Sequence, residues 1–111
     1  MFKDYKISYT KHSQQDVKNM RNYILKTFKY KEYANNFDKK IDKSIKDILK
    51  SPSSFDTIDF TYRNYPIYMV PKESYLFFYT IKGTKMILLR VLKDGMDWEY
   101  IIRLWLKKNG Y

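Results

Sequence analysis

One run of seven residues, YLFFYTI at positions 75–81, constrains the fold of this 111-residue chain more than any other feature. The run is almost wholly apolar and aromatic, without the polar–apolar alternation of a strand that has one face in water. Such a composition is typical of a strand covered on both faces. The run therefore predicts the central strand of a sheet, with the rest of the chain packed around it.

Three further segments predict strands. Tyr5, Ile7 and Tyr9 alternate with polar residues, which indicates a strand with one buried face. Asp59–Val70 is rich in β-formers, although Pro66 interrupts it and indicates an edge position or a bulge. Lys85–Leu92 follows the central run after a Lys-Gly-Thr turn, so the two predict a hairpin.

Helical spacing of apolar residues predicts three helices. The first covers about 14–29, with Ser13 as N-cap and Asp16 completing a variant capping box. The second carries one apolar stripe and ends before Pro52, so the two helices form an antiparallel hairpin. The third begins at an Asp97 cap. The stripe of the second helix comprises Ala34, Phe37, Ile41, Ile45, Ile48 and Leu49.

These elements predict one α+β domain over residues 1–111, in the order β-α-α-β-β-β-α. A helical hairpin at about 14–50 packs on one face of a small antiparallel sheet whose hairpins cover about 59–92. A C-terminal helix follows at about 97–107. Part of the second sheet face is expected to stay free for a partner or substrate.

The composition excludes several classes of function. The chain has no cysteine and one histidine, which argues against disulfide scaffolds, thiol catalysis and most metal sites, so no metal and no cofactor are expected. No apolar run approaches the roughly 18 residues that span a bilayer, and the N-terminus lacks the apolar core of a signal peptide. We expect a cytoplasmic protein. Its net charge of +10 favours a polyanionic or acidic partner.

Only four of the 22 basic residues are arginines, and two of them are candidate functional residues. Arg90 lies within an apolar strand, where an unpaired guanidinium is costly to bury. It must reach solvent, a ligand phosphate or a carboxylate, for which Asp97 and Glu73 are the candidates. Arg63 lies among tyrosines in the sequence. It could stack on their rings, or it could bind phosphate.

Other candidates have equally plausible structural roles. Lys72 and Lys93 lie at strand ends, where lysine is usually only solvated, but Lys93 follows the Arg90 strand. His12, the single histidine, is a candidate general base, but it lies far along the chain from Arg90. The C-terminal helix carries an apolar stripe that fits either a core or a docking surface for a partner. That stripe comprises Trp98, Ile101, Ile102 and Trp105.

The order of elements and several segments resemble the RelE/ParE superfamily of toxins from bacterial type II toxin–antitoxin systems. YKISYTKHSQQDVKNMRNYI resembles the first strand and helix of that family, and ANNFDKKIDKSIKDILKSP its second helix. YRNYPIYMVPKESYLFFYTI resembles its central hairpin. ILLRVLKDGMDWEYII resembles its last strand, with Arg90 before an Asp-Trp helix start. The resemblance covers residues 5–103. It implies a growth-inhibiting toxin, of the kind that stabilises plasmids, neutralised by a cognate antitoxin.

The resemblance implies one of two mechanisms. RelE-like members cut mRNA on the ribosome without a metal, and ParE-like members of the same fold poison DNA gyrase. As an RNase, the chain would use Arg90, Lys93 and Tyr100 in catalysis. Leu76 stands where the RelE pattern has an arginine, and the helical hairpin has ParE-like length, so the ParE-like branch is favoured. A non-toxic nucleic-acid-binding module remains a further alternative.

For these alternatives we expect the following site residues. Arg63, Lys72 and Arg90 would bind the target or nucleic acid. Trp98, Ile102 and Trp105 would bind the antitoxin.

Overall fold

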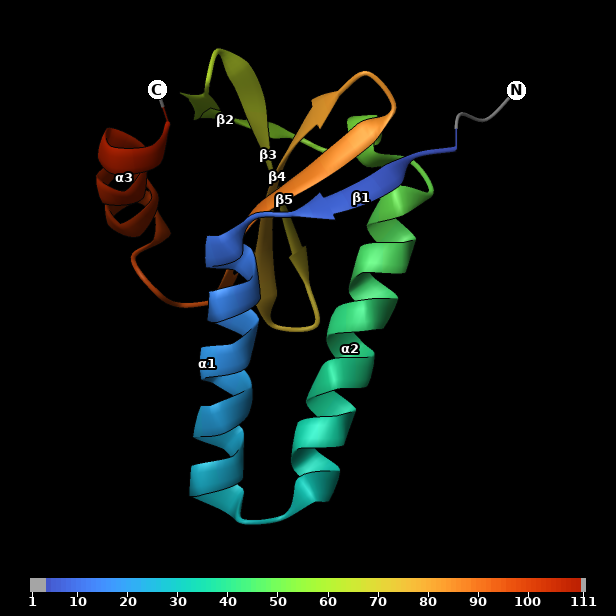
Figure 1. Ribbon diagram of the computed structural model, residues 1–111, viewed down its shortest axis with the longest axis vertical. Helices are drawn as coiled ribbons and strands as arrows, with labels where there is room; N and C mark the ends of the chain where they lie inside the picture. The colour runs from blue at the N-terminus through green and yellow to red at the C-terminus, as the bar shows by residue number, and fades with distance from the viewer. Residues whose placement is uncertain (1–3, 111) are drawn as a thin grey trace.

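The structure is a computed structural model that describes residues 4–110, and it consists of a helical hairpin, a five-stranded sheet and a C-terminal helix (Figure 1). The fold class is the α+β class predicted from the sequence. The elements in chain order are β1 (Lys6–Tyr9), α1 (Lys11–Phe28), α2 (Lys31–Leu49), a 3-10 turn (Pro52–Ser54), β2 (Thr57–Tyr62), β3 (Tyr65–Lys72), β4 (Tyr75–Lys82), β5 (Lys85–Lys93) and α3 (Trp98–Asn109).

The sheet differs from the prediction in two respects. Its strand order is β1-β5-β4-β3-β2, and β1 runs parallel to β5, so the sheet is mixed rather than antiparallel. The segment predicted as one β-rich stretch forms two strands, because Arg63 and Asn64 make a tight turn with positive φ angles of 49° and 72°. Pro66 consequently lies in the interior strand β3, not at an edge. The register of β2 is irregular opposite it, between Thr57 and Thr61.

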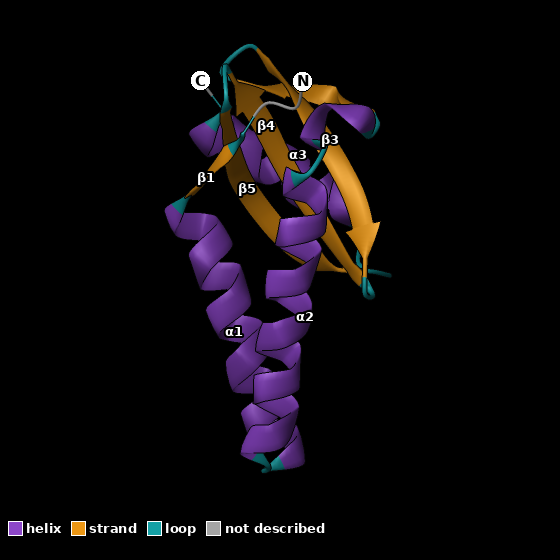
Figure 2. Cartoon of the chain, turned by 90° about the vertical axis from the view of Figure 1, so that its right-hand side faces the viewer, coloured by secondary structure: helices purple, strands orange, loops and turns teal. Residues whose placement is uncertain are grey.

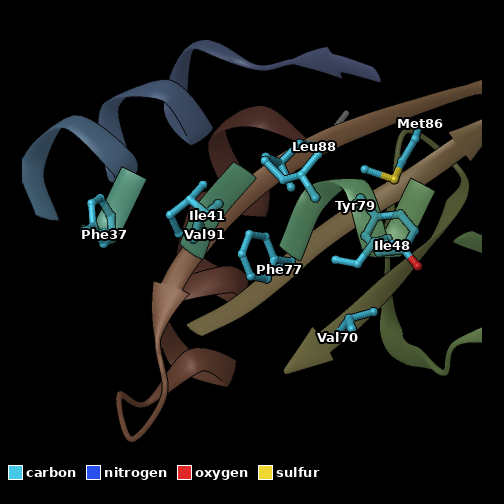
Figure 3. Packing of buried hydrophobic residues seen from close by; sticks show 10 residues of the cluster. Phe37, Ile41, Ile48, Val70, Phe77, Tyr79, Met86, Leu88 and Val91 are labelled. Atoms are coloured by element: carbon cyan, nitrogen blue, oxygen red, sulfur yellow. The ribbon is translucent and has the colours of Figure 1, made fainter. Parts of the chain in front are cut away.

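The central position predicted for the run 75–81 is confirmed. β4 lies between β3 and β5, and five successive residues, 76–80, are buried. Phe77 and Tyr79 face the helical hairpin and form one buried cluster with Ile41 and Ile48 of α2 (Figure 3). Phe37 of α2 packs on Tyr75, at a ring distance of 5.3 Å. Phe78 and Leu76 face the opposite side, where Ile102 and Trp105 of α3 cover them. Because both faces are covered, the strand can be apolar throughout.

The start of α1 also differs from the prediction. Thr10, not Ser13, is the N-cap: its Oγ1 accepts the Ser13 N–H at 3.1 Å. The same hydroxyl donates to the Leu89 carbonyl of β5 at 2.8 Å, and the Thr10 N–H donates to the Leu88 carbonyl. The first turn of α1 therefore continues the hydrogen bonding of β1 along the edge of β5. Asp16 does not act as part of a capping box.

The helical hairpin extends well beyond the sheet, so its tip is remote from both layers of the core (Figure 2). Lys29 closes α1 in the left-handed region with a φ of 61°, and Tyr30 opens α2 directly after it. Arg21 of α1 and Asp38 of α2 join the two helices through a 3.0 Å ion pair. Within residues 4–110, no helix is long and apolar enough to cross a membrane.

Alkaline pH is expected to destabilise the protein. The Tyr79 hydroxyl donates to the Pro52 carbonyl at 2.5 Å inside the core, and burial raises the pKa of Tyr79 above its ordinary value of 10.0. Because this pKa is higher in the folded chain, stability is retained below pH 10 and lost as the pH rises beyond it. Urea unfolding at about pH 8 and about pH 10.5 should show this fall. The Tyr79→Phe variant should reduce it, while losing about 1 kcal/mol with the hydrogen bond.

Candidate functional site

A β-bulge in β5 decides where Arg90 points. The β4–β5 register shifts so that Tyr79 pairs with Leu88 while Phe78 pairs with Arg90, which leaves Leu89 as the extra residue. Strict alternation would place Arg90 on the same face as Leu88, beneath the helical hairpin. The bulge instead turns Val91 toward the hairpin and brings Arg90 to the edge of β5, between α1 and α3.

Arg90 forms a bidentate ion pair with Asp16 of α1. Its Nε and Nη2 donate to the two carboxylate oxygens at 2.7 and 2.8 Å. Asp16 also accepts the Val91 N–H at 3.1 Å, at a point on β5 that β1 does not reach. The two side chains are only 15% and 13% exposed, respectively, so the pair is largely desolvated. The predicted need for a carboxylate is met, but the predicted partners Asp97 and Glu73 are wrong.

Trp105 of α3 lies at the centre of the contacts around this ion pair. Its ring is 5.8 Å from the Arg90 guanidinium carbon and stacks on Tyr62 with a centroid distance of 5.6 Å. His12 meets it edge-on at 5.7 Å. The single histidine therefore contacts an aromatic ring near Arg90 despite its distance along the chain. Together these contacts tie α1, the sheet and α3 to one another.

An open groove runs beside the ion pair, between α1, the end of β5 and the start of α3. Its volume is about 530 Å³, and its surface is mainly apolar. We call it the apolar groove. It is lined by Asp16, Asn19, Met20, Tyr23, Ile24, Tyr75, Arg90, Val91, Leu92, Lys93, Met96 and Ile101.

The chemistry available in the apolar groove is limited. Asp16, the carboxylate in its lining, is engaged by Arg90, and Lys93 supplies an exposed cation at the rim. Burial raises the pKa of Tyr75, so this hydroxyl stays protonated at neutral pH and does not serve as a base. Within residues 4–110, no three histidine or acidic side chains gather as a metal site. The groove suits an apolar ligand with acidic groups better than a reacting phosphodiester.

The structure separates the other predicted site residues. Lys93 lines the apolar groove with Arg90, but Tyr100 projects from an exposed face of α3 and does not line it. Arg63 stacks over the Tyr62 ring at 5.0 Å, in the β2–β3 turn. Lys72 lies 5.8 Å from the Phe55 ring, at the end of β3. The expected set of Arg63, Lys72 and Arg90 therefore does not form one cluster.

The stripe on α3 packs against the sheet. Ile102 and Trp105 are buried and Trp98 is half-buried, packed against Phe78 at a ring distance of 5.8 Å. The cap at the start of this helix is confirmed, because Asp97 accepts the Tyr100 N–H. Binding of an antitoxin by Trp98, Ile102 and Trp105 stays a prediction, and it would require α3 to leave the sheet.

Sequence reasoning missed the role of Asp16 and the lining supplied by Met20, Tyr23 and Met96. The spacing of Asp16 after Ser13 fitted a capping box, which concealed an ion pair that spans 74 positions of the chain. One signal was available in the sequence. Asp16 is a charged residue beside Val17 and Met20, which begin the apolar stripe of α1. A carboxylate there implies a buried cation as its partner.

Two comparisons relate the chain to known proteins. The sequence profile described as "ParE toxin of type II toxin-antitoxin system, parDE" matches residues 7–98. A solved structure from P. aeruginosa, described as a chromosomal ParDE TA system, superposes with a TM-score of 0.67 at 10% identity. The match covers 83% of this chain and 98% of that one, which shows a shared fold. Among curated proteins, no significant match is found.

Proposed function

The chain belongs to the ParE family of type II toxins, and we propose that it inhibits growth by acting on DNA gyrase and is neutralised by a cognate antitoxin. The profile match extends over β1 to the start of α3, which includes the ion pair and every lining residue of the apolar groove except Ile101. The resemblance found in the sequence supports the same branch.

The ion pair of Arg90 with Asp16 is the observation that most favours gyrase over mRNA as the target. RNA hydrolysis needs a cation free to stabilise the charge that develops on the phosphorane, together with a general base and acid. Here the Nε and Nη2 donors of Arg90 are both engaged by Asp16, and the carboxylate offsets the charge. Tyr100 lies outside the groove in which Lys93 is found. The arrangement therefore supports a toxin that acts by binding.

We further propose that the antitoxin occupies the apolar groove. Met96 is 47% exposed at one end of the groove and Tyr23 is 63% exposed along α1, so apolar anchors are accessible without any movement of α3. Lys93 lies at the rim, and the whole chain carries a net charge of +10. An acidic antitoxin segment with apolar anchors would complement both features.

The choice of target is tested with two purified systems. We expect the protein to block supercoiling of relaxed plasmid by gyrase and to trap the cleaved DNA. We expect it to leave mRNA intact on programmed ribosomes. Cuts within the A-site codon, absent with Lys93→Ala protein, would contradict the proposal and establish the RNase alternative. Lys93→Ala is the informative variant because this side chain is exposed and has no part in the Asp16–Arg90 pair.

The proposed antitoxin-binding site is tested with two matched variants of exposed apolar residues. Met96→Asp places a charge in the apolar groove, and Leu104→Asp places one on α3 outside it. Met96→Asp is expected to weaken binding of the cognate antitoxin by at least about tenfold. Leu104→Asp should bind it as the unmodified chain does, in calorimetric titrations of both. Equal binding by the two variants would place the antitoxin elsewhere.

A further inference from the structure

The tip of the helical hairpin carries an exposed aromatic cluster that neither layer of the core uses. Phe28, Tyr30 and Tyr33 are 48%, 67% and 50% exposed. The Tyr33 ring lies 5.1 Å from Phe28 and 6.2 Å from Tyr30, so the rings contact one another at the turn. Clustered exposed aromatic rings on a chain of this size mark an interaction surface.

The tip is also basic. Lys26, Lys29 and Lys31 alternate with the aromatic residues, and Glu32 is the acidic residue among them. The Lys29 N–H donates to the Leu25 carbonyl at 3.0 Å, which closes α1 immediately before α2 begins. We call these three rings and three lysines the tip cluster. It presents flat rings and cations together, at the end of the molecule farthest from the sheet (Figure 2).

From this geometry we infer that the tip cluster binds single-stranded nucleic acid. Unpaired bases stack on exposed aromatic rings whatever their sequence, and neighbouring lysines attract the phosphates between them. Asn36 lines one pocket with Phe28 and Tyr33, and the exposed amides of Asn35 and Asn36 offer hydrogen bonds to base edges. This site is separate from the apolar groove, so the inference goes beyond the proposed function.

Two features favour a nucleic acid over an anionic membrane. Two of the three rings are tyrosines, and the flanking residues are amides, so the tip offers little apolar surface to insert among lipid chains. The outward face of α2 continues the basic surface away from the tip. Lys39, Lys43 and Lys46 follow one another at intervals of four and three residues, opposite the buried Ile41 and Ile45. Asp42 and Asp47 lie on the same face, where Asp47 pairs with Lys50 at 3.7 Å, so the excess positive charge comes from Lys39, Lys43 and Lys46. A nucleic-acid strand can follow such a stripe, whereas a flat membrane touching the tip cannot.

The test measures binding of a fluorescent oligothymidylate of about 12 nucleotides by anisotropy over a range of salt concentrations. Tyr30→Ser with Tyr33→Ser should weaken binding at least about tenfold, because each stacked base is lost. Lys29→Gly with Lys31→Gln should lower the slope of log affinity against log salt by about 1.4. Glycine is chosen at position 29 because it adopts the positive φ there without strain.

The matched control is Lys82→Gln with Lys85→Gln, which removes the same charge at the β4–β5 turn. It should change the affinity for the oligonucleotide by less than the tip variants do. No binding, or equal loss in the control and tip variants, would overturn the inference. Binding of the tip to vesicles of phosphatidylglycerol but not to the oligonucleotide would overturn it in favour of a membrane. Gyrase inhibition by the tip variants is a separate readout, so the failure of either proposal is recognised independently.

Discussion

Replacing Arg90 with alanine is expected to lower the free energy of unfolding by about 3 kcal/mol, because Asp16 is then left as an unpaired charge in a largely desolvated site. Asp16→Ala should be about as costly, since it strands the guanidinium and also removes the acceptor of the Val91 N–H. The measurement is urea unfolding followed by circular dichroism, with the two single variants and the double variant forming a cycle. The double variant should cost less than the sum of the singles.

The exposed ion pair between Arg21 and Asp38 provides the matched control. Its side chains are 38% and 41% exposed, and exposed pairs contribute about 0 to 1 kcal/mol. Arg21→Ala should therefore change stability by no more than about 1 kcal/mol. If Arg90→Ala were as mild as Arg21→Ala, the Asp16–Arg90 pair would not hold α1 against β5.

This result bears on how a toxicity assay is interpreted. If cells that express the Arg90→Ala variant showed no toxicity, the cause could be a smaller amount of folded protein as readily as the loss of a catalytic cation. Lys93→Ala avoids that ambiguity, because Lys93 is exposed at the end of β5.

Replacing Trp105 with alanine is expected to cost about 3 to 5 kcal/mol, the range for removing a large core aromatic ring. The residue is 7% exposed and packs on Tyr62, His12 and Arg90, so its loss should free α3 from the sheet. Chemical denaturation gives the stability, and the fluorescence of the remaining tryptophan, Trp98, reports the release of α3.

Trp105→Phe is the matched control. Among the described residues, no hydrogen-bond acceptor reaches the buried Trp105 Nε1–H, so phenylalanine removes an unsatisfied donor while keeping a ring in place. It should cost clearly less than alanine. If the alanine variant kept full stability, the packing of α3 would contribute little, and release of the helix to an antitoxin would become the better explanation of its apolar stripe.

Much of the architecture was predictable because local patterns agreed with the fold. The apolar run at 75–81 required burial on both faces, and the α2 stripe from Ala34 to Ile48 is buried. Asp97 caps α3 as its position indicated. The prediction erred at the turn of Arg63 and Asn64, because neither residue is the glycine that usually marks positive φ angles. Pairing of β1 with β5 joins segments about 80 positions apart, and no local pattern encodes it.

The sequence by itself determined the helices, the central strand, the basic character and the family resemblance, since each of these depends on periodicity or on residues close together in the chain. It left open whether α3 covers the second face of the sheet, which it does. The tertiary structure alone decided the role of Arg90. A one-residue bulge at Leu89 reverses the alternation of β5, and the parallel pairing of β1 brings α1 alongside, so that Asp16 meets the guanidinium. Both depend on the register between distant strands, which hydrogen bonding and core packing select only when the whole sheet forms.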